Sequence, residues 1–104
     1  MTKVTKIRAR RSGALTEILV LVNHPMETGW REDKVNHSPV PAHYIEQMTF
    51  ELNGSVVAQA HLGAGIAANP LTGIALHDAR PGDEVVVRWV DNTGEGDTAR
   101  TTLA

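Results

Sequence analysis

The chain has 104 residues, enough for one domain with a hydrophobic core, and it contains no cysteine. The lack of cysteine excludes disulfides, thiolate nucleophiles, iron-sulfur clusters and cysteine-ligated zinc. Ten basic and twelve acidic residues give a formal charge of -2. This near balance argues against binding to nucleic acid, whose affinity rests on neutralising phosphates. No stretch approaches the ~20 apolar residues that span a bilayer.

Two strands are expected at the start of the chain. Over residues 4–11, Ile7 and Ala9 alternate with charged residues, and after a glycine turn residues 15–22 form a second strand. Residues 18–22 are apolar on both faces, so we expect this strand to be covered twice or to be covered by another chain. Half of the basic residues crowd around the first strand, where they discourage edge pairing or dock an acidic partner: Lys3, Lys6, Arg8, Arg10 and Arg11.

A long segment from His24 to Ile45 separates this pair of strands from the rest. It has three prolines and no apolar period, and a loop of this length in a compact domain is usually functional or disordered. The segment nevertheless contains Met26, Trp30 and Tyr44. These side chains argue against disorder and predict an ordered surface.

Five further strands are expected after this loop. Of the turns between them, Asn53-Gly54 is the strongest signal, because a type I′ hairpin needs positive φ at both central residues. The apolar positions that define the strands are Met48, Phe50 and Leu52, then Val56, Ala58, Ala60 and Leu62 on one face, then Ile74 and Leu76, then Val85, Val87 and Trp89, before a last strand over residues 98–103. Seven short strands without a helical period predict an all-β fold, an immunoglobulin-like antiparallel β-sandwich in a single domain over residues 1–104.

Histidines and acids of the long loop suggest a metal site. His24, Glu27, His37 and His43 lie within twenty residues of one another, and imidazole and carboxylate groups are common metal ligands. Their spacing matches no metal motif, and a strand-end histidine with an ordinary hydrogen bond explains each of them. We expect no metal ligand here, and we expect His61 and His77, at strand ends, to face solvent.

The sequence gives less support to a serine nucleophile, a catalytic carboxylate pair or a phosphate-binding loop. Ser12, Ser38 and Ser55 lie beside turns without the Gly-x-Ser-x-Gly elbow that exposes a nucleophile. Glu27 with Glu46, or Asp91 with Asp97, could form a carboxylate pair, yet acids in turns usually cap the backbone, and Asp91-Asn92-Thr93-Gly94 is a turn of that kind. The glycine-rich segment 63–70 lacks a phosphate-binding motif. We therefore expect no catalytic residue and no cofactor.

Trp30 is harder to explain by folding alone. It lies in the charged stretch Gly29-Trp30-Arg31-Glu32-Asp33-Lys34. A large apolar ring in such a stretch either plugs the end of the core or anchors a partner. Both alternatives stay open from the sequence.

Several separated motifs together resemble one family, the SoxZ proteins of the bacterial sulfur-oxidation (Sox) system, nearly from end to end. They are His24-Pro25-Met26-Glu27-Thr28-Gly29, Arg31, Asp33-Lys34, Pro41-Ala42-His43-Tyr44-Ile45, Asn53-Gly54, Asn69-Pro70, and Trp89 with Asp91-Asn92 and Gly94. The resemblance implies a non-catalytic subunit that pairs with SoxY, whose flexible glycine-rich C-terminal arm carries sulfur on a single cysteine, and that meets other Sox enzymes transiently. A chain without cysteine cannot exchange with such sulfur adducts.

The resemblance, joined to the apolar surface of the loop and of residues 18–22, predicts a stable heterodimer. The partner-binding residues expected from the loop are Met26, Glu27, Trp30, His43 and Tyr44. Arg10-Arg11 ahead of an apolar stretch resembles a twin-arginine signal, but Glu17 interrupts it, so we expect no signal here. By family resemblance, the location is the periplasm, reached by export with a signal-bearing partner.

Two other functions remain open. One is a mononuclear metal enzyme on the same fold, similar to superoxide reductases, which use loop histidines but also need a thiolate that this chain lacks. The other is an adhesive or chaperone-like module that pairs strands with its partner.

Overall fold

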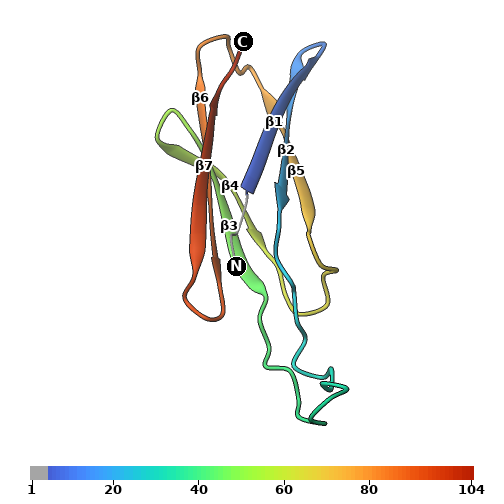
Figure 1. Cartoon of the computed structure of the whole chain (residues 1–104). Coiled ribbons are helices and arrows are strands. Elements are labelled where there is room, and N and C mark those ends of the chain that lie inside the picture. Colours follow the sequence, from blue (N-terminus) through green and yellow to red (C-terminus); the bar gives the residue numbers. More distant parts are fainter. Residues whose placement is uncertain (1–4) are drawn as a thin grey trace.

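The structure, a computed structural model, describes residues 5–104 and consists of seven strands in two packed sheets (Figure 1). Lys3 and the first residue of the expected first strand lie outside the described residues. The strands are β1 (Thr5–Ser12), β2 (Leu15–Val22), β3 (Ile45–Leu52), β4 (Ser55–His61), β5 (Leu71–His77), β6 (Glu84–Asp91) and β7 (Gly96–Thr102). Within residues 5–104 no helix is long and apolar enough to cross a membrane.

The two sheets have the orders β1-β2-β5 and β4-β3-β6-β7, and every pairing is antiparallel. This arrangement confirms the predicted immunoglobulin-like sandwich. The fourth strand pairs with β3, so β5 is left as the last strand of the smaller sheet.

Aliphatic side chains fill the space between the sheets. β2 contributes Ile18, Val20 and Val22, all fully buried, and the facing sheet contributes apolar side chains of β3 and β6, among them Phe50 and Trp89. Because successive side chains of a strand point to opposite faces, the alternation in the sequence predicts this core well.

The predicted hairpin turn after β3 is confirmed, since Asn53 and Gly54 both have positive φ, 50° and 86°. The strand that follows differs from the prediction at one position. Val56 was expected to face inward with Ala58, Ala60 and Leu62, but it is 58 % exposed. The β3–β4 register shifts between Phe50 and Glu51, and such a bulge moves the preceding residues to the other face.

The sandwich is closed along one side and open along the other. On the closed side β1 packs against β7, where the Thr5 hydroxyl donates to Asp97 Oδ2 at 2.8 Å and the Trp89 indole N–H donates to Thr5 Oγ1 at 2.8 Å. On the open side β4 and β5 are the outermost strands of their sheets.

Candidate functional site

The long loop forms an arm that projects beyond one end of the sandwich (Figure 1). We call residues 27–43 the arm. At its root Glu27 and His43 exchange two backbone hydrogen bonds of 2.6 and 2.9 Å, and farther out the Val40 amide donates to the Arg31 carbonyl at 2.7 Å. The arm is therefore an irregular hairpin, which confirms the prediction of an ordered surface.

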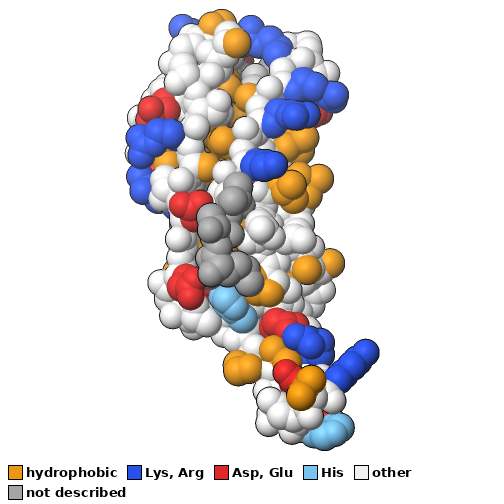
Figure 2. Space-filling model, viewed as in Figure 1, with side chains coloured by type: hydrophobic (Ala, Val, Ile, Leu, Met, Phe, Trp, Pro, Cys, Tyr) orange, Lys and Arg blue, Asp and Glu red, His pale blue; other side chains and the backbone are white. Residues whose placement is uncertain are grey.

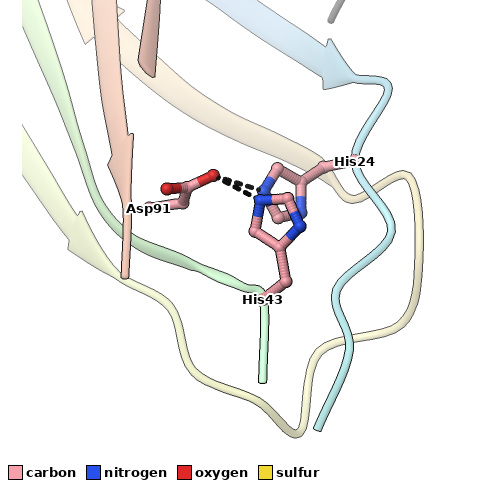
Figure 3. Close-up of side chains that lie close together, drawn as sticks. All are labelled: His24, His43 and Asp91. Atoms are coloured by element: carbon pink, nitrogen blue, oxygen red, sulfur yellow. Dashed lines mark hydrogen bonds and ion pairs between the residues drawn. The ribbon is translucent and has the colours of Figure 1, made fainter. Parts of the chain in front are cut away.

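The root of the arm is fixed by three polar side chains, shown in Figure 3. His24 follows β2, His43 precedes β3, and Asp91 ends β6. The Nε2 atoms of His24 and His43 lie 3.0 and 2.8 Å from Asp91 Oδ2. Asp91 Oδ1 accepts hydrogen bonds from the backbone N–H and hydroxyl of Thr93 and from the Glu95 backbone N–H. One buried carboxylate thus joins the two ends of the arm to the β6–β7 turn.

The position of the proton on His24 follows from its neighbours. The Met26 amide donates to His24 Nδ1 at 3.1 Å, so Nδ1 presents a lone pair and Nε2 carries the proton that is donated to Asp91. The Trp89 ring makes a T-shaped contact with this imidazole, with ring centroids 5.5 Å apart and the ring planes at 88°.

These groups have the chemistry of metal ligands but not the arrangement. Ligand atoms of His24, His43 and Asp91 lie within 4.8 Å of one another. A metal at His24 Nε2 would need a lone pair where the proton is, and a metal at Nδ1 would displace the Met26 amide. The donor pattern fits a hydrogen-bonded clamp rather than a metal site.

Of the four residues that the sequence suggested as a metal group, His24 and His43 come together, whereas Glu27 and His37 lie outside the cluster. Glu27 forms a bidentate ion pair with Arg31, with N–O distances of 2.6 to 3.0 Å. His37 lies at the tip of the arm, where its Nδ1 is 3.0 Å from Glu32 Oε1. Asp91, interpreted from the sequence as a turn residue, is the acid that joins His24 and His43, and it also makes the predicted turn.

The Glu27–Arg31 pair sets the charge state at the outer face of the root. Hydrogen bonding to the Arg31 guanidinium lowers the pKa of the Glu27 carboxyl from its ordinary 4.5, and the same bond raises the pKa of Arg31. Both groups stay charged at neutral pH. The pair links Glu27, which forms the backbone bridge to His43, to Arg31, the residue after Trp30.

The structure distributes the five predicted partner-binding residues over different environments. Met26 is buried, and its sulfur accepts the Ile45 amide at 3.4 Å. Tyr44 is partly buried, while Trp30 is 92 % exposed. Trp30 therefore does not plug the core, which removes one of its two explanations. The assignment of all five residues to a partner interface stays a prediction.

A second apolar surface lies on the outer face of the β1-β2-β5 sheet, and the sequence had indicated only its β2 part. Leu19, Leu21 and Leu71 are 38, 40 and 65 % exposed. Basic side chains of β1 flank them, because Arg8 pairs with Leu19 and Lys6 pairs with Leu21 in the register. Figure 2 shows basic and hydrophobic side chains side by side on this part of the molecule. Lys6, Ile7, Arg8 and the three leucines line an open hollow of about 620 Å³.

A β-sandwich with exposed apolar side chains gathered on one sheet face and on a projecting arm has the features of a protein-binding module. Residues 4–102 match one family, described as sulphur oxidation protein SoxZ. The chain belongs to the SoxZ family and has a role in sulfur oxidation, as its motifs predicted. No match was found among curated proteins.

Proposed function

We propose that this chain is the non-catalytic subunit of a sulfur-carrier complex in thiosulfate oxidation. It binds a SoxY subunit whose C-terminal cysteine carries the sulfur intermediates, and it helps to present that cysteine to the enzymes of the system. Membership of the SoxZ family supports a protein partner in the Sox system. The observation that carries the proposal is the outer face of the β1-β2-β5 sheet.

That face has the composition of an interface. Leu19, Leu21 and Leu71 form a contiguous apolar group, and contiguous exposed apolar surface usually marks a site of protein contact. Lys6 and Arg8 border the group along one side. A partner that buries the leucines and places acidic side chains opposite these two cations matches the surface in both apolar character and charge.

The arm supplies a second, smaller contact. Trp30 is its most exposed aromatic side chain, and aromatic side chains that project from a fixed support serve well as interface anchors. His43 fixes the root of the arm through its contact with Asp91. Glu27 holds Arg31, the residue after Trp30, through an ion pair. We assign this contact to the Sox enzymes that bind transiently rather than to the permanent partner. The contact is small, and charged residues flank Trp30 in the sequence.

The proposed location is the periplasm, reached by export of the folded heterodimer with the signal of the partner. The test is fractionation of cells that express this chain with and without SoxY. The chain should reach the periplasm only when SoxY carries its signal.

Co-expression with SoxY and native mass spectrometry test the proposed function. The chain should co-purify as a one-to-one heterodimer. Leu21→Glu places a charge in the apolar group and should weaken the complex at least about tenfold, the scale of an unpaired charge in an interface. Thr98→Glu, at an exposed position of β7 away from the β1-β2-β5 sheet, adds the same charge as a control and should bind like the parent chain. Failure of the parent chain to co-purify, or equal binding by Leu21→Glu, would contradict the proposal.

A further inference from the structure

The open side of the sandwich carries no charge. Between Glu51 and Asp78 the chain has no Asp, Glu, Lys or Arg, although these residues make up 21 % of it. This segment forms β4, the loop 62–70 and β5, which are the two outermost strands of the open side and the connection between them. The uncharged stretch of sequence is therefore one continuous flank of the molecule.

The hydrogen-bond phase of β5 shows which backbone groups face this flank. The Val22 amide donates to the Pro70 carbonyl at 3.2 Å, one position beyond the Leu21–Leu71 pair with which the β2–β5 register ends. In antiparallel pairs hydrogen-bonded positions alternate, so Thr72, Ile74 and Leu76 bond to β2. The remaining positions direct their N–H and C=O groups away from β2: Leu71, Gly73 and Ala75.

These outward groups form a regular, unprotected strand edge. Proteins usually protect free edges with charged side chains, proline or bulges. β1 carries Lys6, Arg8 and Arg10, and β4 contains a bulge. β5 has neither charge, proline nor register shift over its seven residues. Among the described residues nothing hydrogen-bonds to the outward groups of β5.

The side chains beside this edge are apolar and incompletely covered. Ile74 of β5 and Ala58, Ala60 and Leu62 from the facing sheet are only partly buried against the core. At one end of the edge a hollow of about 360 Å³ is lined mostly by small or apolar residues of the loop and the two strands. A strand added beside β5 would complete the cover over these side chains.

We infer that the free edge of β5 binds an extended, uncharged segment of the partner subunit as an additional strand of the β1-β2-β5 sheet. This inference rests on the proposed function, since the segment belongs to the same partner. Three features select this occupant: the outward backbone groups require an extended chain, the uncharged flank disfavours a charged one because its charges would be desolvated without partners, and Leu71 joins the edge to the outer face.

The position also matches the general architecture of the fold. Constant-type immunoglobulin sheets have a fourth strand next to the equivalent of β5. Here the fourth strand lies in the other sheet, so that place beside β5 is filled by no strand of residues 5–104. The partner segment takes this place and makes both sheets four-stranded.

Amide exchange and one proline substitution test the inference on the SoxY heterodimer and on the isolated chain. In the heterodimer the amides of Gly73 and Ala75 should exchange at least about tenfold more slowly than in the isolated chain, because they become hydrogen-bonded. Ala75→Pro removes an outward N–H that β2 does not use, which edge strands tolerate, and should weaken the heterodimer at least tenfold. Ala75→Thr keeps the N–H and should bind within about threefold of the parent.

Each other outcome contradicts the inference in a distinguishable way. A heterodimer in which these amides exchange as fast as in the isolated chain overturns the strand addition and leaves the proposed function intact. Absence of any heterodimer overturns both. Protection of the same amides in the isolated chain, increasing with concentration, makes a second copy the occupant and overturns the assignment to the partner. If Ala75→Pro is misfolded by circular dichroism, the exchange measurement on the parent chain decides.

Discussion

At the scale of single residues, Asp91 is the residue on which the arm depends. Its two carboxylate oxygens accept hydrogen bonds from two imidazoles, two backbone amides and one hydroxyl. A buried carboxylate is stable only when such donors replace the water it has lost. The same bonds hold His24 and His43 together, so the stability of the site and the direction of the arm have one cause.

Asp91→Asn should therefore destabilise the domain strongly. The amide NH₂ group cannot accept, so at least one buried donor is left unpaired, at about 1–3 kcal/mol for each such group. Urea unfolding followed by circular dichroism should show a loss of this size in the free energy of unfolding. Asp78→Asn is the control, because Asp78 is exposed and asparagine tolerates its positive φ of 61°. Equal stability of the two variants would show that the clamp contributes little.

The sequence revealed only the local half of what Asp91 does. Its hydrogen bonds to Thr93 and Glu95 lie within one turn and follow from the tendency of aspartate to cap turns. Its bonds to His43 and His24 span 48 and 67 residues. No spacing rule encodes such pairs, because they depend on how the two sheets stack. The sequence therefore indicated the two histidines but not Asp91 as their partner.

At the scale of elements, the end of the sandwich opposite the arm is held by a turn-to-turn contact. Asp83 accepts the Arg80 amide at 2.9 Å and the Asn53 side-chain amide at 3.1 Å. The bond from the Arg80 backbone, followed by the bond from Asn53, lowers the pKa of the Asp83 carboxyl from its ordinary 3.8. The contact ties the β3–β4 hairpin to the start of β6.

This contact predicts an acid-sensitive part of the stability. Because the folded-state pKa of Asp83 lies below the unfolded value, the ionised carboxylate stabilises the fold above about pH 3.8, and this contribution is lost as the pH falls through the folded-state pKa. Asp83→Asn should be less stable than the parent at pH 7, and the difference should shrink at about pH 2.5. Urea unfolding at both pH values measures it.

Glu84→Gln serves as the control for Asp83→Asn, because its exposed side chain makes no hydrogen bond within residues 5–104. It should stay close to the parent at both pH values. A difference between Asp83→Asn and the parent that grows on acidification would contradict the assignment.

The strands themselves were largely predictable, and the exceptions have physical causes. Alternation placed Val85, Val87 and Trp89 in the core correctly, because one buried face imposes a period of two. The same rule misplaced Val56, since a bulge depends on cross-strand pairing and leaves no mark in the periodicity. The apolar outer face was predicted for β2 but not for Leu71, which joins it only through the β2–β5 pairing.

The arm and the sandwich should be separable, because the arm leaves the core at its root. Replacement of residues 29–41 by a short glycine linker keeps Met26 and His43 in place, and loop length affects stability only weakly. The sandwich should stay folded within about 1 kcal/mol of the parent, as followed by circular dichroism during urea unfolding. A truncated chain that is unfolded would show that the arm contributes to the core.

At the scale of the whole molecule, the exposed apolar surfaces and the weak net charge act together. The outer face with Leu19 and Leu21, the edge of β5 and Trp30 are all accessible, and a charge of -2 gives little repulsion between copies. Surfaces of this kind favour association, either with the proper partner or among copies of the chain. Under the proposed function, these surfaces are left uncovered in the isolated chain.

The isolated chain should therefore self-associate, and the proposed SoxY partner should suppress this association by covering the same surface. Sedimentation velocity of the chain alone should show a weight-average mass that rises with concentration, while the heterodimer should give one boundary. A Leu19→Glu, Leu21→Glu double variant should sediment as a monomer, because two acidic charges interrupt the apolar face and take the net charge from -2 to -4. Thr98→Glu adds one acidic charge on β7, away from that face and from the edge of β5, and should reduce the association much less. A parent chain that stays monomeric at every concentration and does not bind SoxY would contradict the proposal that this face is an interface.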